Sequence, residues 1–257
     1  MLANRSMAQV LRALFGHQHY IAFFNMMRIY ENVWDAFKRY LFGLGDYPSV
    51  VSVKTPTGVI DLKLYTHHDM LTVNEIFCRK DYRAPQALGV VVDIGSNIGI
   101  SAAYFLTRNK TSRCYLYEPD PANILKLRAQ LSGQFTGRFE LFEYAVADFA
   151  GTVAFGVEET GRYGGIGVKT ERSIPVECRH INDVIAEVLK RESVVDVLKI
   201  DTEGVEIATV KAIDVSLLSR VGRIYIEASP NETLWPGLFD QVQYTSVCQF
   251  TNVKSLG

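Results

Sequence analysis

The sequence has 257 residues, of which 48% are hydrophobic and 21% charged, and its formal net charge is −1. This length and composition fit one large globular domain, or one domain with an appendage, with a sizeable core. A chain so close to neutral lacks the basic excess of nucleic-acid-binding proteins, so we expect no nucleic-acid partner. No run of about 18 uninterrupted apolar residues occurs, which argues against a membrane-spanning helix.

The N-terminus and the cysteines indicate a cytoplasmic protein. The N-terminus lacks the apolar core and small-residue cleavage site of a signal peptide. Cys78, Cys114, Cys178 and Cys248 lie far apart and form no CxxC motif or Cys/His cluster. We therefore expect reduced, buried thiols rather than disulfides or a zinc site.

The first 47 residues are rich in large apolar and aromatic side chains at spacings of three and four, which predicts one or two amphipathic helices. We treat residues 1–47 as an N-terminal helical extension and residues 48–257 as the main domain. Two interpretations of the extension stay open. It packs on the domain or on a second subunit, as in a homodimer, or it makes peripheral contact with a membrane or a lipophilic substrate.

The next segments predict a hairpin, a short helix and then a strand–helix alternation. Residues 49–65 alternate around Pro56, which predicts a β-hairpin, and residues 69–82 predict a short helix. Buried strands are expected at 90–95, 114–119, 139–147, 196–201 and 223–229. Helices are expected near 100–111 and 121–132, and an insertion separates the third strand from the fourth. This alternation predicts an α/β fold, doubly wound around a mostly parallel sheet.

A carboxylate stands near the end of the first predicted strand. In VVVDIGSNIG, which begins at Val90, Asp93 is followed by Gly95 and Gly99. A strand–turn–helix presents unpaired N–H groups to a ligand, and glycines let the backbone approach it. The spacing is G-x-x-x-G rather than the G-x-G-x-x-G of dehydrogenases that bind pyrophosphate. Asp93 would also repel a pyrophosphate, so we predict a zwitterionic or sugar-bearing ligand.

Two further acids follow the next predicted strands. Glu118, in YLYEPDP, lies about twenty residues beyond the glycine turn, where a doubly wound fold binds ribose hydroxyls. Asp148, in AVAD, follows the third strand at the depth of an adenine edge. Each acid alone has a structural alternative, as a helix cap, a surface residue or the start of a turn. Because the three acids end successive strands, together they predict a nucleoside site on one rim of the sheet.

Four motifs, in order, resemble those of the FkbM family of S-adenosylmethionine-dependent methyltransferases: VVDIGSNIGISA, YLYEPDP, AVAD followed by GTVAF, and VLKIDTEGVEIATVKA. The similarity spans about residues 70–230, and K-I-D-x-E-G-x-E is its most distinctive part. It implies a class I methyltransferase fold, with residues 48–257 as the methyltransferase domain. It also implies S-adenosylmethionine as cofactor and a hydroxyl acceptor on a sugar, glycolipid, polyketide or similar small molecule.

The resemblance also places two groups of residues at the cofactor. The group expected at the methionine part follows the first strand: Asp93, Gly95, Ser96, Asn97, Gly99 and Ser101. The group expected at the nucleoside comprises Glu118 for the ribose, with Pro119 and Asp120 beside it, and Asp148 for the adenine. Only 27 residues follow Pro230, so we expect the last helix and the terminal strand pair of the family to be abbreviated.

Asp201 and Glu203, in KIDTEG, end the fourth predicted strand, at the rim where open α/β sheets bind ligands. Two residues apart in an extended segment, their carboxylates face the same side. Three interpretations stay open: a general base for a hydroxyl proton, a Mg²⁺ site, and a structural network that caps the next helix and neutralises Lys199. We do not favour Mg²⁺ and predict no metal ligands, and we name both acids as catalytic candidates.

His68 is the third catalytic candidate, because histidine is the commonest general base. With His67, it stands just before Asp69 in a segment upstream of the first core strand, which borders the pocket in the family. The glycine loop GRYGGIG, from Gly161, is a candidate cover for the acceptor, with Tyr163 as its one large side chain.

The sequence thus predicts a cytoplasmic O-methyltransferase with a small-molecule hydroxyl acceptor. Two alternatives stay open. One is an NAD-dependent oxidoreductase of Rossmann type, against which Asp93 and the missing G-x-G-x-x-G argue. The other is a catalytically silent module that binds S-adenosylmethionine and recruits partners through its aromatic N-terminus.

Overall fold

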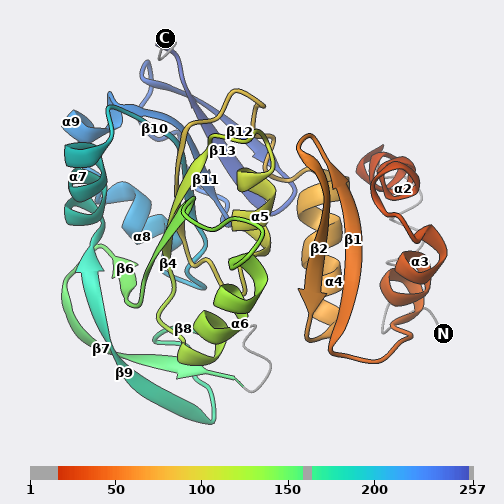
Figure 1. Ribbon diagram of the computed structural model, residues 1–257. Helices are drawn as coiled ribbons and strands as arrows, with labels where there is room; N and C mark the ends of the chain where they lie inside the picture. The colour runs from red at the N-terminus through yellow and green to blue at the C-terminus, as the bar shows by residue number, and fades with distance from the viewer. Residues whose placement is uncertain (1–16, 159–163, 255–257) are drawn as a thin grey trace. The chain divides into compact units, whose positions relative to one another are not determined.

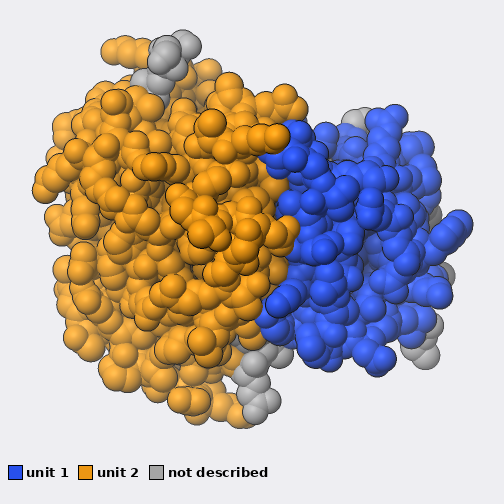
Figure 2. Space-filling model, in the orientation of Figure 1, with its two compact units in different colours: residues 1–83 blue, residues 84–257 orange. Residues whose placement is uncertain are grey.

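The computed structural model describes residues 17–158 and 164–254 (Figure 1). The chain forms two compact units, residues 1–83 and 84–257, which are coloured separately in Figure 2. This division differs from the boundary at residues 47 and 48 that the sequence suggested. The difference arises because the hairpin and the short helix contact the N-terminal helices, and so belong to the first unit.

The first unit combines helices with a two-stranded sheet. Its elements are α2 (His17–Ile29), α3 (Val33–Phe42), β1 (Ser49–Thr55), β2 (Gly58–Leu64), α4 (His67–Val73) and the π-helix η1 (Asn74–Arg79). β1 and β2 pair antiparallel from Ser49 opposite Leu64 to Thr55 opposite Gly58, which confirms the hairpin. Thr66 begins α4 through a capping box with Asp69.

α2 and α3 expose several aromatic side chains, among them Trp34 and Phe24. The ring of Phe23 lies 5.9 Å from that of Phe24 and 5.3 Å from that of Phe37, measured between centroids. The expected helices are therefore present from His17 onward. Contact of this surface with a second subunit, a membrane or a lipophilic substrate stays a prediction. Within the part of the chain that is described, no helix is long and apolar enough to cross a bilayer.

The second unit is built on a seven-stranded sheet in the order β12-β13-β11-β10-β3-β4-β5. Its strands are β3 (Val90–Ile94), β4 (Arg113–Tyr117), β5 (Phe139–Phe142), β10 (Val195–Ile200), β11 (Val221–Ile226), β12 (Phe239–Tyr244) and β13 (Val247–Asn252). The five strands from β11 to β5 are parallel, and β13 and β12 continue the sheet antiparallel. The order reverses between β3 and β10, which is where doubly wound sheets bind ligands.

Helices cover both faces of this sheet, which confirms the predicted α/β class. α5 (Ile100–Leu106) and α6 (Pro121–Leu131) lie on one side, and α7 (Ile181–Arg191), α8 (Glu206–Lys211) and α9 (Val215–Leu218) lie on the other (Figure 1). Asp120 caps α6 by accepting a hydrogen bond from the backbone N–H of Ala122, and Pro121 occupies the first turn. The core between the layers consists largely of buried Val, Ile and Leu side chains.

The insertion forms a second sheet in the order β6-β9-β7-β8. Its strands are β6 (Ala145–Ala147), β7 (Gly151–Val157), β8 (Gly165–Ile166) and β9 (Arg172–His180). The single strand predicted over residues 139–147 is therefore wrong, because β5 belongs to the main sheet and β6 to the second. Both pieces are largely apolar, so their pattern does not show that the chain changes sheets at Glu143 and Tyr144.

The C-terminal region departs from expectation in one respect. The strand pair β12–β13 is present, with six residues in each strand, whereas an abbreviated pair was expected. Residues 227–238, between β11 and β12, contain no helix. The four cysteines are free and buried, as the sequence suggested.

Candidate functional site

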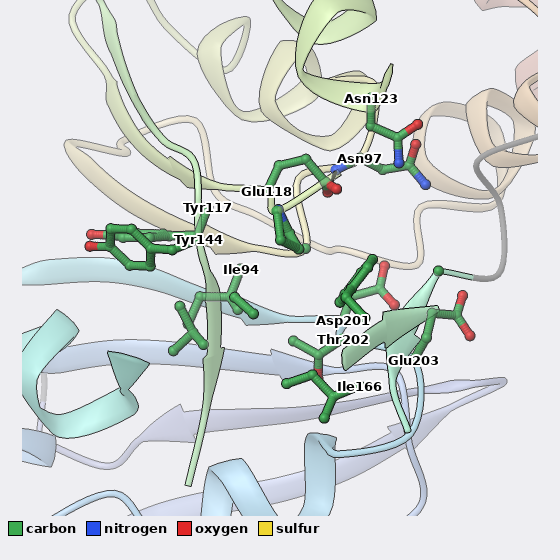
Figure 3. Close-up of a pocket in the computed structure, with 16 residues that line it drawn as sticks. Ile94, Asn97, Tyr117, Glu118, Asn123, Tyr144, Ile166, Asp201, Thr202 and Glu203 are labelled. Atoms are coloured by element: carbon green, nitrogen blue, oxygen red, sulfur yellow. Dashed lines mark hydrogen bonds between the residues drawn. The ribbon is translucent and has the colours of Figure 1, made fainter. Parts of the chain in front are cut away.

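A pocket lies where the carboxyl ends of β3, β4 and β10 meet the second sheet (Figure 3). The rings of Tyr117 and Tyr144 lie together on one side of it, and Asp201 and Glu203 lie on the other. The lining residues are Ile94, Gly95, Asn97, Tyr117, Glu118, Pro119, Asn123, Tyr144, Ala145, Val146, Phe155, Gly164, Ile166, Asp201, Thr202 and Glu203.

The register of the sheet determines which side chains reach this rim. Lys199 pairs with Asp93 on one side, and Asp93 pairs with Leu116 on the other. Two positions further along each strand, Asp201, Gly95 and Glu118 stand side by side just beyond the last paired residues. All three line the pocket, whereas Lys199, Asp93 and Leu116, two positions earlier in the strands, do not.

Gly95 brings the ends of β3 and β10 together. Its φ is 75°, a left-handed value that favours glycine, and a Cβ at this position would lie 1.7 Å from the carbonyl oxygen of Asp201. The Gly95 N–H donates to the carbonyl of Tyr117 at 3.0 Å. The first glycine of the motif is therefore required by this close backbone approach. Gly99, at φ 87°, is the N-cap of α5.

Glu118 presents a buried carboxylate at the end of β4, with 4% of the residue exposed. Oε2 accepts a hydrogen bond from the backbone N–H of Asn97 at 2.8 Å, and Oε1 accepts one from that of Asp120 at 3.0 Å. Burial raises the pKa of Glu118 to about 7 despite these two donors. A carboxylate held in this way can accept further hydrogen bonds from ligand hydroxyls.

Asp93 is completely buried and does not line the pocket. Its Oδ1 lies 3.0 Å from the ammonium of Lys199, and its Oδ2 accepts a hydrogen bond from the Ser101 hydroxyl at 2.6 Å. The structure therefore places Asp93 and Ser101 in an ion-pair network beneath the residues that line the pocket. The physical reason is the register, because Asp93 lies inside β3 and not beyond its end.

Lys199 connects this network to the pocket. Its ammonium lies 2.9 Å from the carbonyl oxygen of Gly95 and 3.3 Å from Oδ2 of Asp201. Burial acts to lower the pKa of Lys199, but the carboxylates of Asp93 and Asp201 outweigh it and raise that pKa. Lys199 is therefore a buried ammonium cation with three oxygen acceptors. Asp201 thus contacts Lys199, as in one of the three interpretations that the sequence left open for the acids of this motif.

The turn after β10 is held by Glu206, whose carboxylate accepts hydrogen bonds from the backbone N–H groups of Thr202 and Gly204. Glu203 adopts φ 55°, and Gly204 follows at 114°. This left-handed turn keeps Glu203 at the exposed edge of the pocket while Asp201 is only partly exposed. Both catalytic candidates from the β10 motif therefore reach the pocket.

Asp148 is not brought to the pocket. It is exposed and follows β6 in the second sheet. The main-sheet strand β5 ends six residues earlier, at Phe142, so the position beside its carboxyl end belongs to Tyr144 and Ala145. The ring of Tyr117 stacks on that of Phe142, with 5.0 Å between centroids, and that of Tyr144 lies 5.5 Å away. An aromatic wall thus occupies the place where the sequence suggested an acid.

Of the remaining candidates, some support the backbone near the pocket and others line the pocket. Ser96 is buried within the turn, where its hydroxyl donates to the Asp93 carbonyl and accepts from the Tyr117 N–H, and Asp120 caps α6. Asn97 and Pro119 line the pocket. His68 lies on α4 in the first unit, whereas every lining residue belongs to the second. Tyr163 lies outside the described residues.

Several lining residues were not anticipated from the sequence. Tyr117, Tyr144 and Phe155 look like core residues of apolar strands, and nothing in their local sequence distinguishes them from residues of the core. Asn123 could have been recognised as a candidate, because it is a polar residue on the first turn of α6, five residues beyond Glu118. In the structure it is buried. No group of three or more His, Cys, Asp or Glu side chains within residues 17–158 and 164–254 is arranged to hold a metal ion.

The strand order of the parallel sheet reverses between β3 and β10, and the antiparallel strand β13 lies beside β11. This arrangement is the class I methyltransferase fold. The methyltransferase FkbM domain family matches residues 93–247, which is more than half of the chain. The chain therefore belongs to the FkbM methyltransferase family, as the motifs suggested. S-adenosylmethionine, the cofactor that the resemblance implied, is the methyl donor of this family.

The solved structures that resemble this chain include other methyltransferases. An rRNA methylase of Streptococcus thermophilus has a TM-score of 0.39 and 14% identity, and the match covers 64% of this chain and 87% of that one. TrmK of M. capricolum, solved with S-adenosylhomocysteine, has a TM-score of 0.39 and 11% identity, with coverages of 71% and 68%. A methyltransferase of Geobacter sulfurreducens has a TM-score of 0.39 and 13% identity, with coverages of 70% and 78%. TM-scores below 0.5 do not bear on the substrate of this chain. No curated protein sequence matches significantly.

Proposed function

We propose that this protein transfers the methyl group of S-adenosylmethionine to a hydroxyl group of a small molecule. The observation that carries this proposal is the row Asp201–Gly95–Glu118, which puts a hydroxyl-binding carboxylate and a proton-accepting carboxylate at opposite ends of one rim. When bound, the cofactor supplies an electrophilic methyl group. The acceptor then needs only to be oriented and to lose its proton.

The residues present fit this cofactor. Glu118 is positioned to accept hydrogen bonds from ribose hydroxyls, and the Tyr117 and Tyr144 rings offer an aromatic face for the base. Gly95, Asn97 and Pro119 border the same space, where a Cβ at Gly95 could not be accommodated. Gly99, Ser96, Ser101, Asp93 and Asp120 support this rim from beneath or from the adjoining helices.

Asp201 is our first choice for the group that takes the acceptor proton, and Glu203 is the second. Asp201 is partly exposed to the pocket, and one of its oxygens, Oδ2, is directed to Lys199. That contact leaves Oδ1 for a ligand. His68 stays a weaker proposal, since the described residues that line the pocket all belong to the second unit. The net charge of −1 supports an acceptor other than nucleic acid, and the four free, buried cysteines support a cytoplasmic location.

Calorimetric titration of the full chain with S-adenosylmethionine, S-adenosylhomocysteine and NAD tests the donor. We expect both sulfur ligands to bind and NAD not to bind. Binding of NAD alone would instead support the oxidoreductase alternative. Transfer of a labelled methyl group to a panel of sugar, polyketide and lipid alcohols tests the acceptor, with Asp201→Asn as the matched inactive variant. Donor binding without transfer to any alcohol would favour the silent module.

A further inference from the structure

The pocket has an excess of negative charge that binding of a nucleoside does not require. The described residues that line it include three carboxylates, those of Glu118, Asp201 and Glu203, and none of them is Lys, Arg or His. The pocket therefore presents fixed anions to whatever ligand enters it.

Lys199, a buried cation beside the pocket, does not cancel this charge. Lys199 has three N–H donors, and three oxygens surround them: the Gly95 carbonyl at 2.9 Å, Asp93 Oδ1 at 3.0 Å and Asp201 Oδ2 at 3.3 Å. Its single positive charge faces two carboxylates. With all three groups ionised, Asp93, Lys199 and Asp201 together carry one net negative charge, and Asp201 is the one of the three that lines the pocket.

The position of Asp201 directs this remaining charge into the pocket. Its side chain is 24% exposed, whereas those of Asp93 and Lys199 are 0% and 2% exposed. Figure 3 shows Asp201 between Thr202 and the rim that carries Glu118. The Oγ1 atom of Thr202 is also buried and has no hydrogen-bond partner in the described part of the chain. This end of the pocket is therefore anionic.

We propose that Asp201 makes the pocket selective for ligand charge, so that it binds the cationic S-adenosylmethionine more tightly than the neutral S-adenosylhomocysteine. This inference rests on the proposed donor. The two ligands share the ribose, the adenine and the amino-acid group, so contacts with Glu118 contribute equally to both. They differ in the methylated sulfonium, whose positive charge is stabilised by a carboxylate in a partly desolvated site.

The same charge assists the exchange of product for substrate. During transfer, a lone pair of the acceptor oxygen forms the new O–C bond, and the sulfur keeps the electron pair of the C–S bond that breaks. The hydroxyl proton passes to Asp201, so a sulfonium and a carboxylate become a thioether and a carboxylic acid. When that proton leaves for water, the neutral product again faces a carboxylate that has lost its cation, and a new donor molecule binds in preference.

The dissociation constants of the two ligands, measured by calorimetry on the full chain at pH 8, test this inference. We expect the ratio of Kd for S-adenosylhomocysteine to Kd for S-adenosylmethionine to be about ten, the effect of one charge-assisted contact. An analogue with an ammonium group in place of the methylsulfonium should bind like the donor. Asp201→Asn should bring the ratio close to one, whereas Glu118→Gln should weaken both ligands and leave the ratio unchanged. Asp240→Asn, an exposed acid on β12, is the matched control.

Two results would overturn the proposal: a ratio of one or less in the unmodified protein, or an unchanged ratio in a folded Asp201→Asn variant. Salt provides a test that needs no variant. Raising the ionic strength should weaken binding of the cationic ligands more than binding of S-adenosylhomocysteine, and equal weakening would also overturn the proposal. Failure of both sulfur ligands to bind would overturn the donor assignment itself, which distinguishes the two hypotheses.

Discussion

Asp93 and Glu118 occupy neighbouring strands of one sheet, and both are buried acids, yet they serve opposite purposes. Glu118 follows the last residue of β4 and lines the pocket, with backbone N–H groups as its partners. Asp93 precedes the last residue of β3 and contacts Lys199 and Ser101 under the rim. A displacement of two positions in register therefore separates an acid that lines the pocket from one that pairs with Lys199 beneath it.

This comparison shows that the neighbours of an acid matter more than its burial. Asp93 is beside a buried ammonium, so its charge stabilises the junction of β3 and β10. Glu118 has hydrogen-bond donors but no cation beside it among the described residues, and burial raises its pKa to about 7. The first acid is committed to the fold, and the second keeps hydrogen-bonding capacity for a ligand. The predictions below test this difference, beginning with the largest effect.

Replacement of Asp93 should mainly destabilise the protein. Asp93→Ala leaves the ammonium of Lys199 buried beside Asp201 alone, and we expect the free energy of unfolding in urea to fall by about 3–5 kcal/mol. Glu232→Gln removes an exposed ion pair with Lys211 and should cost at most about 1 kcal/mol. An Asp93→Ala protein of normal stability that cannot bind S-adenosylmethionine would place this acid at the cofactor, as the motif suggested.

Replacement of Glu118 should mainly weaken binding. Glu118→Gln removes a charged acceptor of ribose hydroxyls, so the binding free energy of S-adenosylmethionine should become about 1.5–3 kcal/mol less favourable. The stability of the free protein should not fall to the same extent, since no buried cation loses its partner. Calorimetry and urea unfolding on one preparation measure the two quantities. A variant with normal affinity but lowered stability would reverse the roles assigned to the two acids.

The raised pKa of Glu118 predicts a pH dependence of binding. Above pH 7 the carboxylate is ionised and ready to accept hydroxyl donors, and below pH 7 a proton must first leave. For one proton released at a pKa of about 7, the affinity for S-adenosylmethionine should be about tenfold lower at pH 6 than at pH 8. The affinity of Glu118→Gln should stay nearly constant over this range. A flat profile for the unmodified protein would contradict the assignment.

Asp148 should have the smallest effect. Because it is exposed and lies outside the pocket, Asp148→Asn should change the free energies of binding and unfolding by less than about 0.5 kcal/mol. Tyr144→Ala is the informative partner, because it removes a ring from the pocket wall. A marked loss of affinity for S-adenosylmethionine in Asp148→Asn alone would show that the acid reaches the adenine after all.

The sequence predicted the fold well because strand and helix patterns are local. The strands before Gly95 and Glu118 and the β10 motif end close to where they were expected. The sequence did not reveal the split between β5 and β6, since the apolar pattern continues through the change of sheet. Because of this split, Asp148 lies outside the pocket, and Tyr144, which the sequence did not single out, lines it. The ion pair of Lys199 with Asp93 depends on register between strands distant in sequence, which no local pattern records.

Gly95 has a consequence for how this site can change over generations. The separation of β3 and β10 at the rim, and with it the span from Asp201 to Glu118, is set by the absence of a side chain at position 95. Substitution of Gly95 by any larger residue would force β3 and β10 apart at this point, whatever its effect on contacts with a ligand. Residues on the second sheet, such as Phe155 and Ile166, are free of this constraint. Position 95 is thus closed to any residue that has a Cβ.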